Sequence, residues 1–362
     1  MLKVIELFGG IGACTSALKR LNIDFEIVDY VDIDKYAVKS YNAINGTNFD
    51  PQDITKYDKD IQADLIMHGS PCQDFSVCGK NAGGDFGSGT RSSLMYETLR
   101  IVNKIKPKYV IWENVKNILS KRHFHNFQDY LNIMNSFGYN SYYKVLNAKD
   151  YGIPQNRERV FTVSIRKDID NGTFKFPEQE ELKIKLKDLL EEDVEEKYYL
   201  NNEIKEKILY NYKDNGTNLI GGFGKIGSTN QYHLQNRIYK GDITNVICTT
   251  CNPYYLIKNN TEQGYLKAYA GDGLYTNIST KRGTVQHETI PTLTSFQDKG
   301  VITNDFKIRK LTPKECWRLM GFSDEEFEKA EKVNSNTQLY KQAGNSIVVD
   351  VLFKILRGLN LC

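Results

Sequence analysis

The first half of the chain alternates short apolar runs with amphipathic stretches, and this alternation constrains the fold more than any other feature. The apolar runs predict buried strands at residues 2–7, 25–31, 64–67, 109–112, 142–146 and 160–165. Amphipathic stretches at 12–21 and 35–43 predict helices that connect the first strands. Strands that alternate with helices form a wound α/β sheet, so this is the fold class that we expect.

The organisation of the chain points to two domains, because 362 residues exceed what one core usually accommodates. The region of Pro177, followed by acidic residues and lysines, indicates a boundary beyond which the periodicity weakens. Regular helical patterning returns after Thr312 and closes the chain at 347–359. We expect one domain from residues 1–178 plus 334–362 and a smaller one from residues 179–333.

The composition, with 40% hydrophobic and 26% charged residues, is that of an ordinary globular protein. No apolar run could span a bilayer and the start lacks the features of a signal peptide, so we expect a cytoplasmic protein with no membrane partner. Seven scattered cysteines argue against a disulfide framework and leave a thiol available for chemistry. Residues 201–310 carry 14 basic and 9 acidic side chains, which fits nucleic-acid contact and a solvated polar lobe about equally.

A glycine-rich loop, Glu6-Leu7-Phe8-Gly9-Gly10-Ile11-Gly12-Ala13, lies between the first predicted strand and helix. Such a loop lets a nucleotide-like ligand approach the backbone closely. Asp32, at the end of the second strand, can accept hydrogen bonds from both hydroxyls of a ribose. Asp53 follows a turn and could receive an adenine amino group, although an Asp there is more often a capping residue. These residues predict an adenosine-bearing cofactor and leave NAD and S-adenosylmethionine unresolved.

Three further motifs adjoin predicted strands and carry reactive side chains. Gly69-Ser70-Pro71-Cys72-Gln73-Asp74-Phe75-Ser76 puts a thiol at the mouth of the sheet, where it can attack only as a thiolate. Glu113-Asn114-Val115 follows the strand at 109–112 and can reach the same pocket. In Gln155-Asn156-Arg157-Glu158-Arg159, the two arginines point the same way on an extended chain. They could therefore clamp a base carbonyl and a phosphate.

In this order, the motifs resemble those of the cytosine-5 DNA methyltransferases from one end of the chain to the other. The resemblance rests on Phe8-Gly9-Gly10-Ile11-Gly12, Asp32-Ile33-Asp34-Lys35, Asp53-Ile54, Pro71-Cys72-Gln73, Glu113-Asn114-Val115, Gln155 to Arg159, the stretch 309–322, Gln338-Leu339-Tyr340 and Gly344-Asn345-Ser346. Any one of these motifs occurs by chance, whereas the ordered set does not. The resemblance implies a Rossmann-like S-adenosylmethionine-dependent methyltransferase sheet with a second, smaller target-recognition domain.

The resemblance also implies DNA (cytosine-5-)-methyltransferase activity on a cytosine flipped out of the duplex. Cys72 would add to ring carbon 6, Glu113 would hold or donate a proton at ring nitrogen 3, and Arg159 would bind the ring carbonyl. Arg157 would help to position the pocket. S-adenosyl-L-methionine would be bound by Phe8, Gly10, Gly12, Asp32, Ile33, Asp53, Ile54, Pro71, Leu94, Asn345 and Ser346.

The implied partner is double-stranded DNA, bound by Gln73, Ser76, Arg91, Ser92, Lys281, Arg282 and Thr292. Residues 79–94 carry five glycines and correspond to the family's mobile loop that closes over DNA. Lys281 and Arg282 could instead belong to a solvated turn, whereas Thr292-Leu293 resembles the family's short Thr-Leu signature. The expected setting is a restriction-modification, orphan or phage system. A cognate endonuclease would then be a functional and not a physical partner, and the enzyme would act as a monomer.

Four positions depart from the family pattern, and we expect none of them to abolish function. Glu6 stands for the usual Asp, Ser70 for the usual Phe, and Asp32 for the usual Glu. Ile33 stands where a larger apolar or aromatic residue often packs on the adenine.

Two other motifs suggest different chemistry. Cys248-Thr249-Thr250-Cys251 has metal-ligand spacing but no second ligand pair, so we expect no metal. Asn252-Pro253-Tyr254-Tyr255 resembles an amino-methyltransferase motif but lacks its second proline. His123 and His125 fall in a helix-like segment and are predicted to lie at the surface.

Three alternative functions remain open at this point. A tRNA cytosine-5 methyltransferase would use the same chemistry on another substrate. A nicotinamide-dependent oxidoreductase would explain the glycine loop and Asp32, but not Pro71-Cys72-Gln73 or the arginine motif. A non-catalytic DNA-binding relative is disfavoured by the intact Cys72, Glu113 and Arg159.

Overall fold

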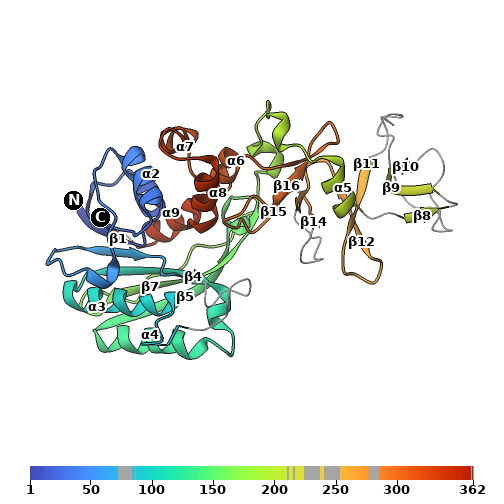
Figure 1. Cartoon of the computed structure of the whole chain (residues 1–362). Coiled ribbons are helices and arrows are strands. Elements are labelled where there is room, and N and C mark those ends of the chain that lie inside the picture. The colour runs from blue at the N-terminus through green and yellow to red at the C-terminus, as the bar shows by residue number, and fades with distance from the viewer. Residues whose placement is uncertain are drawn as a thin grey trace. The chain divides into compact units, whose positions relative to one another are not determined.

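The computed structural model describes residues 1–71, 84–85, 87–209, 212–214, 217–223, 237–239, 253–276, 285–359 and 361, which form two compact units (Figure 1). Unit 1 comprises Met1–Ile153, Arg157–Glu181 and Trp317–Cys362, and unit 2 comprises Pro154–Asn156 and Leu182–Cys316. The chain thus returns to unit 1 at Trp317, earlier than the border expected at 333/334. The Trp317 ring packs on Phe322 and Phe327, which fixes this segment in unit 1. The functional assignment of the two units stays a prediction.

Unit 1 is built around a six-stranded sheet of order β2-β1-β3-β4-β7-β5. Its strands are β1 (Leu2–Leu7), β2 (Phe25–Val31), β3 (Leu65–His68), β4 (Tyr109–Val115), β5 (Tyr139–Asn147) and β7 (Glu158–Arg166). Strands β2, β1, β3 and β4 pair in parallel, and β7 lies antiparallel between β4 and β5. The predicted α/β class is confirmed, with one reversed strand that the alternation alone does not reveal.

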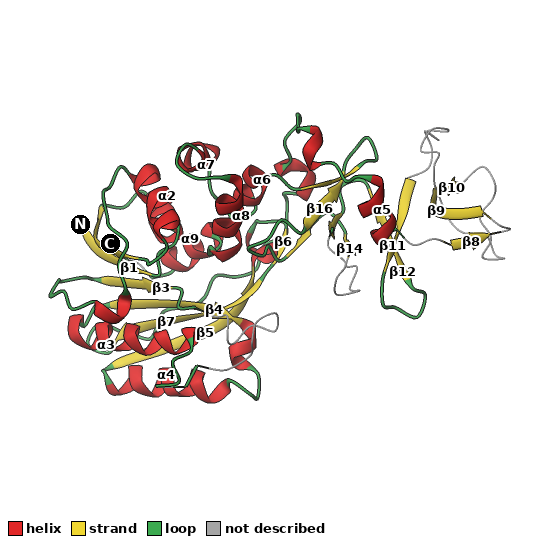
Figure 2. Cartoon of the chain, in the orientation of Figure 1, coloured by secondary structure: helices red, strands yellow, loops and turns green. Residues whose placement is uncertain are grey.

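Helices cover both faces of this sheet, with α3 and α4 on one face and α2 and α9 on the other (Figure 2). The helices of unit 1 are α1 (Ala13–Leu21), α2 (Lys35–Asn45), α3 (Met95–Ile105), α4 (Phe124–Ser136), α7 (Asp324–Glu331), α8 (Asn336–Asn345) and α9 (Val349–Arg357). Local sequence sets their ends. The Asp34 carboxylate accepts the Tyr36 N–H to cap α2, which stops at Gly46 in the left-handed region. Ser323 and Glu326 form a capping box at the start of α7.

The core of unit 1 lies where the sheet packs on α3 and α4. Ile66 and Trp112 of the sheet are buried there with Phe127 and Tyr130 of α4. This packing covers the middle of the strands. It leaves their carboxyl ends, where the predicted motifs stand, to build a site.

Unit 2 is mostly β-structure, with one sheet formed by β8 to β12, a second of order β14-β13-β16-β17, and the parallel pair β15-β6. Its strands are β6 (Gln155–Asn156), β8 (Tyr212–Asp214), β9 (Thr217–Phe223), β10 (Arg237–Tyr239), β11 (Pro253–Lys258), β12 (Tyr265–Tyr269), β13 (Gly273–Tyr275), β14 (Val285–Gln286), β15 (Ile290–Pro291), β16 (Lys299–Ile302) and β17 (Ile308–Lys310). Helix α5 (Asn202–Ile208) belongs to this unit, and α6 (Pro313–Arg318) contains the border between the units. Within the described ranges, no helix has the length and apolar character needed to cross a membrane.

Candidate active site

The glycine-rich loop after β1 is shaped by three residues in the left-handed region, Phe8, Gly10 and Gly12. It is held from two directions, because the Tyr30 hydroxyl donates to the Gly10 carbonyl (2.7 Å) and the Gly10 N–H donates to Asp32 Oδ2 (2.9 Å). A Cβ added to Gly10 would meet no atom within 4 Å. The loop therefore presents bare backbone to open space, as a site for a nucleotide-like ligand requires.

A small cavity of about 30 Å³ adjoins this loop within unit 1. It is lined by Glu6, Leu7, Phe8, Gly9, Gly10, Ala13, Cys14, Met67, Gly69, Ser346 and Ile347. The cavity thus brings together three of the predicted cofactor residues, Phe8, Gly10 and Ser346. Sequence reasoning missed Met67 and Ile347, because a single apolar residue carries no chemical signal of its own.

Glu6, which replaces the usual Asp, is buried beside the cavity and caps α1 from outside the helix. Its Oε1 accepts hydrogen bonds from the Thr15 N–H (3.2 Å), the Thr15 hydroxyl and the Tyr41 hydroxyl (3.3 Å). Helix α1 needs this cap because the residue at its N-cap is Gly12, which has no side chain. Burial raises the pKa of Glu6 to about 7, although the hydrogen bonds from Thr15 oppose the rise.

Asp32 lies at the end of β2, as predicted, and orders the segment around it. Its two oxygens accept the N–H groups of Gly10 (2.9 Å) and Asp34 (2.8 Å), and Asp34 in turn pairs with Lys341 of α8 (2.7 Å). Burial raises the pKa of Asp32, and the two backbone N–H groups oppose the rise. Each carboxylate oxygen keeps further acceptor capacity, which fits the two hydroxyls of a ribose. The neighbouring Ile33 side chain is 71% exposed and available to a ligand.

The other eight predicted cofactor residues do not line this cavity, and three of them, Asp53, Ile54 and Leu94, have other roles in the structure. Asp53 accepts the N–H (3.0 Å) and hydroxyl (2.8 Å) of Thr55, which is the capping role weighed as the alternative. Ile54 is buried in the core of unit 1, and Leu94 packs against that core. Their contact with a cofactor stays a prediction.

Glu113 and Arg159 form an ion pair at the end of β4, where β7 runs antiparallel to it. Arg159 Nε lies 3.0 Å from Glu113 Oε1, and the side chains are 17% and 12% exposed. A Cβ added to Gly69 would lie 3.8 Å from Glu113 Oε2, so the turn leading to Cys72 passes beside this carboxylate. Burial raises the pKa of Glu113, and the positive charges of Arg159 and Arg157 oppose the rise. The shift is toward the protonated form, which is the direction that a proton donor needs.

Arg157, which lies between β6 and β7, is almost fully buried and braces the C-terminal end of α8. Its Nη2 donates to the carbonyls of Gly344 (3.1 Å) and Ser346 (2.7 Å). A cation at the end of a helix also interacts favourably with the helix dipole. Arg157 therefore fixes the backbone around Asn345 and Ser346, beside the cavity, which suits the positioning role predicted for it.

The predicted nucleophile and most of the predicted DNA-binding residues lie outside the described residues: Cys72, Gln73, Ser76, Lys281 and Arg282. The described part of the 79–94 loop includes Arg91, which is exposed, and Ser92, which is fully buried. Ser92 could meet a phosphate only if this segment moved. Pro71 is the last residue described before Cys72, and it is half-buried.

The Thr-Leu pair is tied to the start of the arginine motif within unit 2. The Thr292 hydroxyl donates to the Asn156 carbonyl (2.6 Å), and the Leu293 N–H donates to Gln155 Oε1 (3.0 Å). The Thr292 hydroxyl is thus engaged in holding the parallel strands β15 and β6 together. Its predicted contact with DNA stays a prediction.

The two histidines predicted at the surface behave differently. His125 is exposed and its Nε2 lies 2.7 Å from Asp85 Oδ1, whereas His123 is buried at the start of α4, so the prediction for His123 is wrong. The reason is that His123 precedes the helix and packs under its first turn. Within the described residues, no group of three or more potential ligands could hold a metal ion. Cys248 and Cys251 lie outside those residues.

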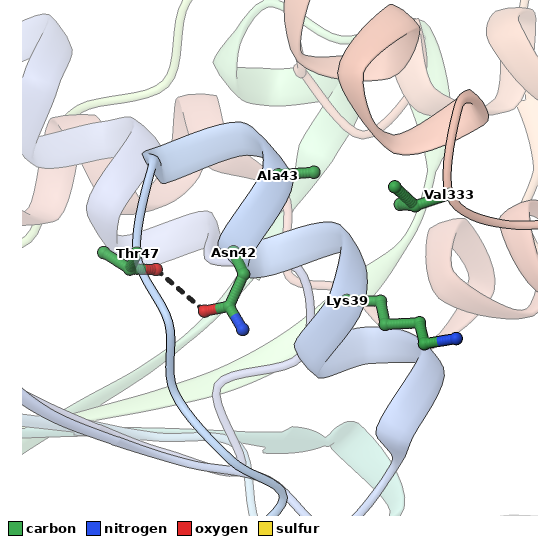
Figure 3. A pocket seen from close by; sticks show the side chains of 5 residues that line it. All are labelled: Lys39, Asn42, Ala43, Thr47 and Val333. Carbon is green, nitrogen blue, oxygen red and sulfur yellow. Dashed lines mark hydrogen bonds between the residues drawn. The ribbon is translucent and has the colours of Figure 1, made fainter.

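A second hollow of unit 1 lies over α2 (Figure 3). It is lined by Lys39, Asn42, Ala43, Thr47 and Val333. Asn42 Oδ1 accepts the Thr47 hydroxyl (2.9 Å) and the Phe49 N–H (3.0 Å), so its amide is used to hold the turn after α2. None of the residues predicted for catalysis or cofactor binding lines this hollow.

The glycine loop, Asp32 and the Glu113–Arg159 pair at the strand ends are the features of a methyltransferase of the cofactor-binding α/β type. Residues 2–360 match the family model described as C-5 cytosine-specific DNA methylase. The chain is 33% identical to the type II methyltransferase M2.ScrFI of Lactococcus lactis subsp. cremoris, over 99% of each chain. It is 34% identical to the type II methyltransferase M.HhaI of Haemophilus parahaemolyticus, over 97% of this chain and 92% of that one. It is 31% identical to the orphan methyltransferase M.SPBetaI of Bacillus phage SPbeta, over 99% and 97%.

Solved structures share the fold at lower sequence identity. A mutant of the Dnmt2 protein of Spodoptera frugiperda superposes with a TM-score of 0.62 at 19% identity, over 99% of each chain. A putative DNA modification methyltransferase from an E. coli prophage gives 0.60 at 20% identity, over 99% and 98%.

The chain belongs to the C-5 cytosine-specific DNA methylase family. It is an S-adenosylmethionine-dependent DNA (cytosine-5)-methyltransferase, and DNA is its substrate. The sequence-based predictions of family, fold, activity and cofactor are thereby confirmed. The nicotinamide-dependent oxidoreductase is excluded.

Proposed function

We propose that this enzyme flips a target cytosine out of duplex DNA and methylates it through a covalent adduct with Cys72. The observation that carries the proposal is the Glu113–Arg159 pair beside Gly69, three residues before Cys72. A thiol and a carboxyl group brought to one place can attack carbon 6 and protonate nitrogen 3 of the same ring. Arg159 would hydrogen-bond the ring carbonyl, and Arg157 would act as a brace for the pocket.

The chemistry begins with the Cys72 thiolate, whose electron pair forms a bond to ring carbon 6. The electrons of the 5,6 double bond shift through the ring as nitrogen 3 takes the proton of Glu113, which leaves carbon 5 nucleophilic as part of an enamine. When bound, S-adenosylmethionine supplies the electrophilic methyl group for carbon 5 and is converted into S-adenosylhomocysteine. A base then removes the proton from carbon 5, the double bond re-forms, nitrogen 3 returns its proton, and the Cys72 thiolate leaves.

Three of the residues that would hold the cofactor, Phe8, Gly10 and Ser346, line the cavity of unit 1. Asp32 would bind the ribose hydroxyls, Gly10 and Gly12 would admit the ligand to the backbone, and Phe8 and Ile33 would offer apolar contact. Asn345 and Ser346, braced by Arg157, would complete the pocket. Asp53, Ile54, Pro71 and Leu94 remain in the proposal on the strength of the family motifs alone.

We assign DNA recognition to the smaller domain, residues 179–333, and catalysis to residues 1–178 plus 334–362. Extrusion of the cytosine costs a few kcal/mol, which contacts in the pocket and along the backbone offset. The proposed DNA contacts are Gln73, Ser76, Arg91, Ser92, Lys281, Arg282 and Thr292. Of these, Arg91 has the strongest structural support, because its side chain is exposed.

The relatives suggest the biological setting, since two are named as type II methyltransferases and one as a phage orphan methyltransferase. We propose the same range of settings here, with a cognate endonuclease as a functional partner only. A monomer working in the cytoplasm would meet its DNA without further partners.

Transfer of tritium-labelled methyl groups from S-adenosylmethionine tests the proposal against its tRNA alternative. The substrates are duplex DNA that contains all short sequence contexts and a matched amount of total tRNA. We expect label only in DNA, recovered as 5-methylcytosine after digestion to nucleosides. Label that enters tRNA and spares DNA would contradict the proposal, and label on a base amino group would exclude the Cys72 mechanism.

A further inference from the structure

A buried hydrogen bond links the turn before Cys72 to the strand that carries Glu113. The indole N–H of Trp112, in β4, donates to the Ser70 hydroxyl over 2.9 Å. Both side chains are buried, at 1% and 3% exposed. An indole N–H withdrawn from water needs an acceptor, and Ser70 supplies it where the family pattern has an apolar Phe.

The Trp112 ring is itself fixed by its neighbours under the sheet. Its centroid lies 4.0 Å from that of Tyr130 and 5.9 Å from that of Phe127, both on α4. Its centroid also lies 5.8 Å from that of the nearly parallel ring of His68, the last residue of β3. A ring held on several sides can act as a rigid anchor for whatever its N–H grips.

The anchor matters because the β3–β4 ladder ends just before the reactive residues. The last paired residues are His68 and Trp112. Beyond them, the Gly69 backbone faces Glu113 Oε2 and Ile347, whereas Ser70 contacts Trp112 on the α4 side. This alternation matches extended chain, in which successive side chains point to opposite faces.

We propose that Trp112 and Ser70 are positioning residues that hold the turn before Cys72 in register with Glu113. Ser70 lies two residues before Cys72, and Trp112 lies immediately before Glu113. Their hydrogen bond therefore sets the distance between the two groups that must act on one cytosine ring. This inference rests on the proposed role of Cys72. A misplacement of about 1 Å can cost a factor of up to about 100 in rate, so the loss of one such bond should be measurable.

The test compares Trp112→Phe, Ser70→Ala and the double variant with a matched control, Trp317→Phe. Trp317 is the only other tryptophan of the chain, is equally buried, and donates its indole N–H to the Leu339 carbonyl over 3.0 Å. Each Trp→Phe change removes one buried N–H and keeps an aromatic ring. A comparison of the two variants therefore distinguishes a loss of positioning from a general loss of stability.

The readouts are the rate of adduct formation with 5-fluorocytosine duplex DNA, kcat, KM for both substrates, and Tm. We expect Trp112→Phe and Ser70→Ala each to slow adduct formation and kcat about ten-fold with unchanged KM values. The double variant should be no slower than either single one, because both remove the same bond. Trp317→Phe should lower Tm and leave the adduct rate unchanged.

Wild-type adduct rates in both Trp112→Phe and Ser70→Ala would overturn the inference, as would losses that multiply in the double variant. An equal rate loss in Trp317→Phe would also overturn it, by assigning the effect to stability. These outcomes are distinct from failure of the proposed function, which would show as an adduct that persists in Cys72→Ser.

Discussion

Units 1 and 2 each hold an arginine–carboxylate pair, half-buried in Glu113–Arg159 and fully buried in Glu315–Arg309, and the pairs differ in how fully the carboxylate is used. In unit 2, Arg309 grips Glu315 with two hydrogen bonds of 2.8 and 2.6 Å, and the side chains are 2% and 0% exposed. Glu315 also accepts the N–H groups of Thr312 (2.8 Å) and Glu191 (2.9 Å). In unit 1, Arg159 Nε lies 3.0 Å from Glu113 Oε1.

The difference separates an ion pair that holds a fold from one that serves a reaction. Glu315 has partners for both oxygens and is sealed from solvent, so it has nothing left to offer a ligand. Glu113 keeps its Oε2 without a hydrogen bond from any of the described residues, next to the turn that leads to Cys72. This half-buried oxygen therefore keeps the capacity to accept a hydrogen bond from a bound ligand.

The largest effect should come from Glu113→Gln, which keeps the shape of the side chain but removes its acidic proton. We expect kcat to fall by about 10²- to 10⁴-fold, the range supplied by general acid–base groups. The free energy of unfolding should not fall, because burial already disfavours the charged form. Single-turnover methylation and urea unfolding of the same preparation measure the two quantities. Undiminished kcat would remove Glu113 from the mechanism.

Glu315→Gln should give the opposite pattern. The amide group would turn donors toward Arg309 and leave that buried charge without a counter-charge, so we expect a loss of about 3–5 kcal/mol in unfolding free energy. The protein that remains folded should form the 5-fluorocytosine adduct at the wild-type rate. Urea unfolding at 15 °C measures the stability. A variant as stable as the wild type would contradict the structural role assigned to Glu315.

Glu6 is another buried carboxylate, and the hydrogen bonds that it accepts all go to its Oε1. Its titration makes the stability of the protein depend on pH. Its pKa of about 7 in the folded protein lies above the ordinary value of 4.5. The folded state therefore binds more protons than the unfolded state between these values, and stability falls as the pH rises through this window. Glu6→Gln lacks this dependence, so it should gain up to about 3 kcal/mol relative to wild type between pH 4.5 and pH 8. Parallel unfolding curves at all pH values would contradict the assignment.

The smallest effect should come from Lys341→Met, which breaks the half-exposed pair with Asp34. Such pairs contribute about 0–1 kcal/mol, so Tm should hardly change. Because Asp34 donates its N–H to Asp32, the Kd for S-adenosylmethionine should rise by no more than about five-fold, measured by calorimetry. Lys354→Met, which breaks a pair with Glu180 elsewhere in unit 1, should leave that Kd unchanged.

Local sequence predicts some of this structure closely. The strands at Leu2–Leu7 and Phe25–Val31 have the predicted ends, because turn-forming residues flank each of these mainly apolar stretches. Strand β4 runs to Val115, beyond its predicted end at 112, because Glu113 and Asn114 continue the ladder with β7 although they are polar. The reversed direction of β7 depends on contacts distant in sequence, which periodicity does not encode.

The candidate site shows the same limit. Motif order identified Glu113, Arg157 and Arg159, and the strand end at 112 indicated that Glu113 would reach the same pocket as Cys72. Which atoms they contact did not follow, since the carbonyl partners of Arg157 on α8 lie 187 and 189 residues away. The link from Trp112 to Ser70 was missed for a similar reason. Ser70 stands in place of the usual Phe, and its importance cannot be recognised until the hydrogen bond from the Trp112 indole is known.

The central claim is covalent catalysis by Cys72 on a cytosine of DNA, and trapping on duplex DNA that carries 5-fluorocytosine tests it most directly. Fluorine at carbon 5 cannot leave as a proton does, so the adduct should persist on a denaturing gel when S-adenosylmethionine is present. The account predicts an adduct with the wild-type enzyme on a pool of all short sequence contexts, and none with Cys72→Ser. An adduct that survives in Cys72→Ser, or no wild-type adduct anywhere in the pool, would contradict it.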